Sequence, residues 1–141
     1  MSDESPTLSA VYLFVRDMAK TLAFYRRLGL AVPEAGGHFA RVQMPGGLSI
    51  EFGTAELTKG YDPNWREPSG ASTNTLNFSL ASRDAVDEMY AALTGAGYTA
   101  HLAPIDAFWG SRFAIIDDPD GNIVGLHSPR DPERGSPPPV W

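Results

Sequence analysis

The sequence predicts an α+β fold in which a βαβββ unit occurs twice in tandem. Apolar runs typical of strands alternate with two segments typical of amphipathic helices, in the same order in both halves of the chain. Corresponding positions also recur at the same spacing: Val15 precedes Tyr25 by ten residues, and Leu80 precedes Tyr90 by ten. This agreement indicates a duplicated unit.

The turns of the two halves support the duplication independently. Pro45, in the turn "PGG", precedes Glu51 by six residues, and Pro119, in the turn "DPDG", precedes Gly125 by six. Proline presets the backbone at the second position of such turns, and glycine tolerates the conformation that the later positions require. Each turn therefore predicts a hairpin, and position 125 is the counterpart of position 51.

The first module is expected over about residues 8–53. Asp17 is a candidate N-cap for its helix, the residues Met18, Leu22 and Tyr25 form an apolar stripe, and Gly29 is a candidate stop signal. In chain order we expect a strand over 8–15, a helix over 18–28, a short strand over 30–34, and strands over 38–44 and 48–53.

The second module is expected over about residues 74–127, after a polar connection over 54–73. Ser82 is a candidate N-cap for its helix. We expect strands over 75–80, 98–103, 112–117 and 122–127, a helix over 82–97, and a Pro-rich tail over 128–141 that is extended or disordered. The whole chain, residues 1–141, is expected to form a single domain.

Composition excludes several classes of function. The chain has 141 residues, of which 43% are hydrophobic and 20% charged, and its net charge is −6, so that no nucleic-acid partner is expected. It has no cysteine, which excludes disulfides and thiolate metal sites. With no signal pattern and no apolar run of about 20 residues, we expect no membrane association and a cytoplasmic location.

Alternation along the strands predicts a cavity. One side of each strand is apolar and would face the helices, whereas the other side carries small polar and aromatic groups rather than the Lys, Arg and Glu of an open surface. Such groups are typical of a partly enclosed site with convergent polar side chains. The residues expected there include Tyr12, Ser49, Glu51, Thr75, Asn77, Ser79 and His127.

Four segments make the chain similar to a known superfamily. They are "VRDMAKTLAFYRRLGL", "LSIEFG", "LTGAGY" and "WGSRFAIIDDPDGNIVGL", of which the last, with "WG" ahead of "DPDGN", is the most specific. Over roughly residues 8–128 the chain resembles the vicinal oxygen chelate superfamily, which includes glyoxalase I, bleomycin-resistance proteins and extradiol dioxygenases. The resemblance implies a curved, mostly antiparallel eight-stranded sheet with helices on its outer face, and a homodimer.

The resemblance also implies four metal-ligand positions, and the sequence departs from them. The expected His, Glu, His and Glu fall on Ala10, Glu51, Thr75 and Gly125 respectively, so that only Glu51 matches. A divalent cation normally needs three or more protein N or O ligands in such sites. We therefore expect no metal and no other cofactor. His127 lies two residues beyond Gly125, about 6.6 Å along the strand, which is too far to replace it without a shift of register.

These observations predict a small-molecule-binding protein of the glyoxalase/bleomycin-resistance type that sequesters an antibiotic or an aromatic metabolite in a dimer cleft. The candidate ligand-binding residues are Tyr12, Phe14, Glu51, Asn77, Trp109 and His127. The alternative is an enzyme: a lyase, isomerase or dioxygenase with an atypical metal site, or with acid–base chemistry from Glu51 or His127. The sequence assigns no catalytic residue and no particular ligand. Arg112 is expected to form an ion pair with a nearby acid.

Overall fold

Parallel pairing between strands that are distant in sequence organises each half of the molecule. The computed structural model describes residues 5–34 and 37–139, and the chain divides between Ser69 and Gly70 into two units. Each unit contains one mixed sheet, in which the first strand of the unit pairs in parallel with its last strand. This repetition is the structural counterpart of the duplicated spacing in the sequence.

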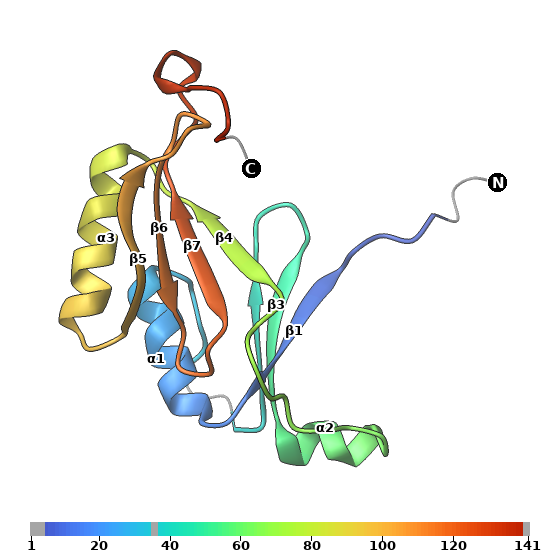
Figure 1. Ribbon diagram of the computed structural model, residues 1–141. Coiled ribbons are helices and arrows are strands. Elements are labelled where there is room, and N and C mark those ends of the chain that lie inside the picture. Colours follow the sequence, from blue (N-terminus) through green and yellow to red (C-terminus); the bar gives the residue numbers. More distant parts are fainter. Residues whose placement is uncertain (1–4, 35–36, 140–141) are drawn as a thin grey trace. The chain divides into compact units, whose positions relative to one another are not determined.

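The first unit contains a three-stranded sheet in the order β1-β3-β2 (Figure 1). The hairpin of β2 and β3 is antiparallel, and β1 lies parallel to β3. Its elements are β1 (Ala10–Val15), α1 (Met18–Leu28), β2 (Phe39–Gln43), β3 (Ser49–Thr54) and α2 (Ala55–Tyr61).

Helix α1 begins and ends where the sequence predicts. The Asp17 side chain accepts a hydrogen bond from the Lys20 amide, and Gly29 closes the helix in the left-handed region at φ 111°. Tyr25, on the buried face of α1, has its ring centroid 5.1 Å from that of Phe52 on β3, and both side chains are completely buried. This contact joins helix and sheet in the core of the first unit.

The second unit contains a four-stranded sheet in the order β4-β7-β6-β5. Helix α3 lies alongside β5 and β6 (Figure 1), and Val86 and Leu93 on its inner face are completely buried. The elements are β4 (Thr75–Ser79), α3 (Arg83–Gly95), β5 (Thr99–Asp106), β6 (Arg112–Asp117), β7 (Ile123–His127) and the 3₁₀ helix η2 (Pro132–Arg134).

The predicted "DPDG" turn joins β6 to β7. The carboxylate of Asp118, which is buried, accepts hydrogen bonds from the amides of Asp120 and Asn122 at 2.9 and 2.8 Å. Gly121 adopts φ +85°, the conformation that favours glycine at the end of the turn. Side-chain capping of the loop therefore holds β7 in register with β6.

The α+β fold class is confirmed, with three antiparallel and two parallel strand pairs among the described residues. The number of strands differs from the prediction. Residues 5–34 and 37–139 contain seven strands rather than eight, because residues 30–34 form no strand. The amide of Leu30 bonds back to the Tyr25 carbonyl at the end of α1, and Pro33 has no N–H to offer a sheet.

One further prediction needs correction. The segment 54–73 is not wholly a connection, because Thr54 caps the seven-residue helix α2 by accepting a hydrogen bond from the Leu57 amide. The tail was expected to be extended or disordered; over residues 128–139 it contains η2 and otherwise forms neither helix nor strand. Of the helices in the described part of the chain, none has both the length and the apolar character needed to cross a membrane.

Candidate functional site

The polar face of the first unit is the side of β3 that points away from α1. Because Phe52 contacts Tyr25 of α1, its neighbours Glu51 and Gly53 point to the opposite face. Parallel pairing places Tyr12 beside Glu51 and Phe14 beside Gly53. Three predicted site residues, Tyr12, Phe14 and Glu51, therefore share this face.

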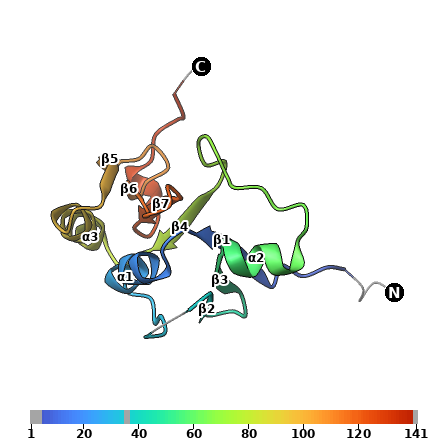
Figure 2. The same cartoon turned by 90° about the horizontal axis from the view of Figure 1, so that it is seen from below.

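Tyr12 lies across β3 and is held there by α2. Its hydroxyl is hydrogen bonded at 3.1 Å to the Oγ1 of Thr58, a buried residue of α2. The phenol covers Gly53 so closely that a Cβ built on Gly53 would overlap the Tyr12 hydroxyl. A hydrogen bond with Tyr12, together with partial desolvation, raises the pKa of Tyr61 above its usual value. The first unit therefore fixes Tyr12 in one orientation (Figure 2 shows α2 beside β1 and β3).

Phe14 belongs to an aromatic and cationic cluster. Its ring centroid lies 5.2 Å from that of Trp65, which follows α2. The guanidinium of Arg16 lies 5.1 Å from the centre of the Phe14 ring, and the ammonium of Lys59 lies 5.3 Å from that of Trp65. These cation–π contacts cover part of the Phe14 and Trp65 rings. The Phe14 side chain is half-buried.

Glu51 is neutralised by an arginine on the neighbouring strand. Both Nε and one terminal nitrogen of Arg41 lie 3.0 Å from Glu51 Oε2. The side chain of Glu51 is 18% exposed and that of Arg41 56%, so the carboxylate lies deeper than its partner. Glu51, a predicted ligand-binding residue, therefore already has a cation beside its carboxylate.

In the second unit, Asn77 occupies the space above Gly125. The two residues are direct partners across the parallel pair β4 and β7. A Cβ built on Gly125 would overlap Asn77 Oδ1 and would come within 3.2 Å of Phe113 Cε1. The glycine that interrupts β7 therefore permits the Asn77 side chain to lie flat on the sheet.

His127 ends β7 and contacts Ser79 on β4. Its Nε2 lies 3.4 Å from Ser79 Oγ, and its Nδ1 lies 3.4 Å from the Ser128 carbonyl oxygen. Both contacts are long for hydrogen bonds. The ring is half-buried, beside a hydroxyl that can orient it.

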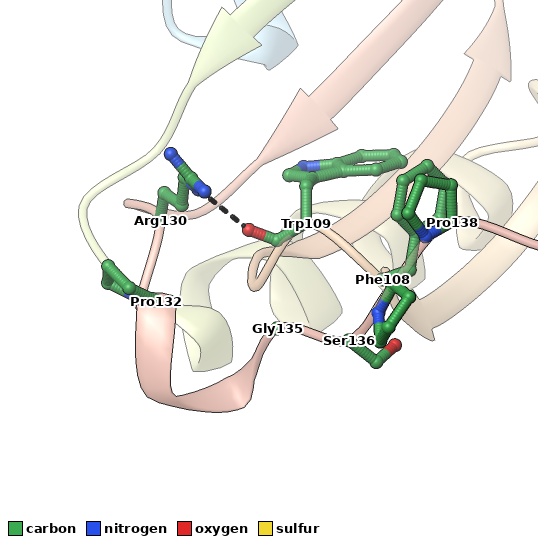
Figure 3. Close-up of a pocket in the computed structure, with 8 residues that line it drawn as sticks. Phe108, Trp109, Arg130, Pro132, Gly135, Ser136 and Pro138 are labelled. Atoms are coloured by element: carbon green, nitrogen blue, oxygen red, sulfur yellow. Dashed lines mark hydrogen bonds between the residues drawn. The ribbon is translucent and has the colours of Figure 1, made fainter.

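Trp109 lies in the loop between β5 and β6. Its ring packs edge-on against Phe108 and Phe113, with centroid separations of 5.2 Å for both pairs. With Phe108 and the C-terminal segment it lines a pocket of about 500 Å³ (Figure 3). Among the predicted site residues, Trp109 is the one that lines this pocket.

An ion-pair network anchors that loop to α3. Arg112 donates to Asp87 at 2.9 Å and to Asp106 at 3.1 Å, which confirms the predicted ion pair, and Arg83 also pairs with Asp106. The hydrogen bond to Asp87 raises the pKa of Arg112. Desolvation would raise the pKa of Asp106, but the hydrogen bonds and charges of Arg112 and Arg83 outweigh it and hold this pKa below its usual value.

The four positions at which the resemblance implies metal ligands do not fit a metal ion. Ala10 and Gly125 offer no donor atom, Thr75 offers only a hydroxyl, and Glu51 is paired with Arg41. Within residues 5–34 and 37–139, no group of three or more His, Cys, Asp or Glu side chains is arranged to hold a cation. These positions therefore do not supply the set of ligands that the resemblance implies.

Three contacts were not foreseen: Arg41, Thr58 and Trp65. Arg41 could have been found, because it and Glu51 are each five residues from Gly46 at the hairpin turn and therefore face each other across it. Thr58 and Trp65 carry no such signal, since they lie in the segment that reads as a connection.

Comparison with known proteins identifies the family. The family model described as "Glyoxalase/Bleomycin resistance protein/Dioxygenase superfamily" matches residues 7–126. No curated protein sequence gives a significant match.

Solved structures of the same kind are similar to the chain. A glyoxalase/bleomycin resistance protein/dioxygenase family enzyme from Burkholderia phytofirmans PsJN is 27% identical, with a TM-score of 0.75 over 87% of this chain and 98% of that one. A glyoxalase-related enzyme from Fulvimarina pelagi is 18% identical, with a TM-score of 0.76 over 87% and 88%. A glyoxalase/bleomycin resistance protein/dioxygenase from Nocardioides is 22% identical, with a TM-score of 0.72 over 98% and 91%; the latter two show the fold alone.

Proposed function

Since the chain belongs to the glyoxalase/bleomycin resistance protein/dioxygenase superfamily, we propose that it is a member that binds a small molecule without a metal ion. The observation that carries the proposal is the pair of Asn77 and Gly125. At the position that the resemblance assigns to an acidic ligand, the residue has no side chain, and Asn77 fills the space where one would begin. An amide in that place offers directional hydrogen bonds to an organic molecule rather than charge to a cation.

The first unit supports the proposal through Glu51. Its carboxylate is paired with Arg41, so that a cation arriving there would have to displace a guanidinium that contacts the same oxygen through two nitrogens. A polar organic group would meet both charges together. Tyr12 and Phe14 supply aromatic surface on the same face.

Each unit by itself offers three of the residues proposed to contact a ligand. The first unit offers Tyr12, Phe14 and Glu51, and the second offers Asn77, Trp109 and His127. Aromatic rings that are already packed lose little freedom on binding, which favours a planar, partly apolar ligand such as an aromatic metabolite or an antibiotic.

An acid–base enzyme has less support. Glu51 is engaged by Arg41, and in the described part of the chain the side-chain hydrogen bonds of His127 are those of 3.4 Å to Ser79 and Ser128. General bases normally need an activated, accessible acceptor atom within hydrogen-bond reach of the substrate.

The proposal is tested by a thermal-shift screen of antibiotics and aromatic metabolites against protein treated with EDTA. We expect at least one compound to raise the melting temperature, and we expect the shift to stay the same after addition of Zn²⁺, Ni²⁺, Mn²⁺ or Fe²⁺. The variant Glu51→Gln should weaken the best compound, whereas Glu88→Gln, the same change at an exposed position of α3, should not. A shift that appears only with metal would contradict the proposal.

Three further features belong to the same proposal: a homodimer, a cytoplasmic location and a role in antibiotic resistance. Light scattering coupled to size exclusion should give the mass of two chains. Expression in a susceptible host should raise tolerance to a compound found in the screen, with the Glu51→Gln variant as the control.

A further inference from the structure

A pocket formed by the C-terminal segment and the loop between β5 and β6 has the features of a ligand site. Its volume of about 500 Å³ lies within the range of about 300–1,000 Å³ that is typical of small-molecule sites. Figure 3 shows the Trp109 indole with Arg130 on one side and Pro138 on the other. The lining residues are Phe108, Trp109, Arg130, Pro132, Gly135, Ser136, Pro137 and Pro138.

Backbone hydrogen bonds hold the segment against the loop. The Asp131 amide donates to the Gly110 carbonyl at 3.0 Å, and the Ser136 amide donates to the Phe108 carbonyl at 2.7 Å. Gly110 adopts φ +100°, and a Cβ there would overlap the Asp131 carbonyl, so that only glycine allows the two backbones to approach this closely. The walls of the pocket are therefore fixed relative to each other.

The apolar wall of the pocket remains open to solvent. Phe108 and Trp109 are each 36% exposed, although both are large aromatic residues. Pro137 and Pro138 add rings that have few conformations to lose. A planar aromatic molecule would cover these surfaces at a small cost in conformational entropy.

Among the residues that the structure describes, one positive charge of the pocket, that of Arg130, has no acidic partner. Arg130 uses Nε to donate to the Trp109 carbonyl at 2.9 Å, and no Asp or Glu of residues 5–34 and 37–139 forms an ion pair with it. The nearby Arg134, by contrast, pairs with Asp131 at 3.4 Å. The terminal nitrogens of Arg130 are therefore available for a carboxylate or a sulfonate, which a guanidinium binds in a fork.

We propose that this pocket binds a planar aromatic molecule that carries one anionic group, with the ring against Trp109 and Phe108 and the anion on Arg130. The inference rests on the proposed metal-independent binding function and names the chemical class of its ligand. It also gives the C-terminal segment a function, as the outer wall of the site.

Two fluorescent probes of matched shape separate the two parts of the proposal. Anilinonaphthalene sulfonate carries an aromatic system and one sulfonate, and N-phenyl-1-naphthylamine carries the same rings without the charge. We would titrate each into the full chain in EDTA and follow both probe emission and the quenching of tryptophan. We expect the sulfonate to bind more tightly than the neutral probe, with one site per chain.

Arg130→Gln is the central variant, and Arg134→Gln is its matched control in the same segment. Loss of the Arg130 charge should weaken the sulfonate about tenfold, as expected for a charge-assisted contact, and should change the neutral probe less than about twofold. Arg134→Gln should change both less than about twofold. Trp109→Leu should weaken both probes about five- to tenfold, because it removes the stacking surface.

The experiment distinguishes failure of the proposed pocket from failure of the proposed metal-independent function. Equal effects of Arg130→Gln and Arg134→Gln on the sulfonate would overturn the proposal, as would unchanged binding of both probes in Trp109→Leu. Both arginines are exposed, so these two variants test the charge even if the melting temperature shows that Trp109→Leu has perturbed the loop. If the probes depend on Trp109 and Arg130 while the protein binds a metal stoichiometrically, the pocket stands and the proposed metal-independent function fails.

Discussion

The two units of the chain differ at one corresponding position, residue 51 in the first unit and residue 125 in the second. In the first unit the acidic residue, Glu51, is present and Arg41 neutralises it. In the second unit the acid is replaced by Gly125, and Asn77 lies over the vacant place. Each unit also contains a strand glycine covered by a side chain from the adjacent parallel strand, Gly53 by Tyr12 and Gly125 by Asn77. At the two positions where the resemblance implies an acidic ligand, the first unit therefore has a paired acid and the second has no side chain.

The covering side chains differ in how firmly they are held, and substitution of the glycines should reveal this. Gly53→Ala should destabilise the protein by about 1–3 kcal/mol, because its Cβ displaces a phenol that is hydrogen bonded to the buried Thr58. Urea unfolding measures the change. In a Tyr12→Ala background the same substitution should cost far less; an equal cost would show that Tyr12 does not cover Gly53.

The ion pair of the first unit has no counterpart at Gly125, and a double-mutant cycle measures its contribution. Arg41→Gln and Glu51→Gln should couple by about 0.5–1 kcal/mol, near the upper end for pairs that are partly exposed. The coupling should fall in 1 M NaCl, because salt screens exposed charges. A coupling near zero would mean that Glu51 is free to meet a ligand.

Gly125→Ala should change stability by no more than about 0.5 kcal/mol, in contrast to Gly53→Ala. The overlapping atom is the end of the Asn77 side chain, which is exposed and can turn away, while alanine is favoured over glycine in a strand by about 0.5–1 kcal/mol. Thermal unfolding tests this. A loss as large as that of Gly53→Ala would show that Asn77 is held as rigidly as Tyr12.

The smallest expected effect concerns pH and the network around Asp106. Its pKa is lower in the folded state than in the unfolded chain, so its contribution is present above the unfolded pKa and is lost as pH falls through the folded pKa. Asp106→Asn should therefore reduce stability slightly at pH 7 and have no effect well below about pH 3. In the described part of the first unit no aspartate pairs with two arginines, and Asp62→Asn, the same substitution at an aspartate that accepts a hydrogen bond from the Asn64 amide, serves as the control in melting curves between pH 2 and 7.

Most of the fold follows from the sequence because its signals are local. Asp17 and Gly29 bound α1, Ser82 caps α3, and the turns at Pro45 and Pro119 bound the hairpins. The prediction of a short strand over 30–34 was wrong, because this segment continues from the end of α1 and pairs with no strand among the described residues. Helix α2 was missed because its seven residues include Gly60 and carry no apolar stripe.

The site is less predictable, because its partners come from segments without periodicity. Alternation along the strands was enough to place Tyr12, Phe14 and Glu51 on one face. The register of β1 against β3 agrees with this placement. Thr58, which holds Tyr12, and Trp65, which covers Phe14, lie in the segment that was expected to be a connection. Arg130, which lines the pocket of Trp109, lies in the tail that was expected to be extended or disordered. Only the hairpin register offered a signal in advance, and it would have revealed Arg41.

Calorimetric titration of the EDTA-treated and dialysed chain with Zn²⁺, Ni²⁺, Mn²⁺ and Fe²⁺, with elemental analysis of the purified protein, tests the central claim most directly. With Ala10, Thr75 and Gly125 at three of the four ligand positions and Glu51 paired with Arg41, we predict no stoichiometric binding at micromolar affinity. One metal ion per chain, bound with micromolar affinity or better and lost in Glu51→Gln, would contradict the account.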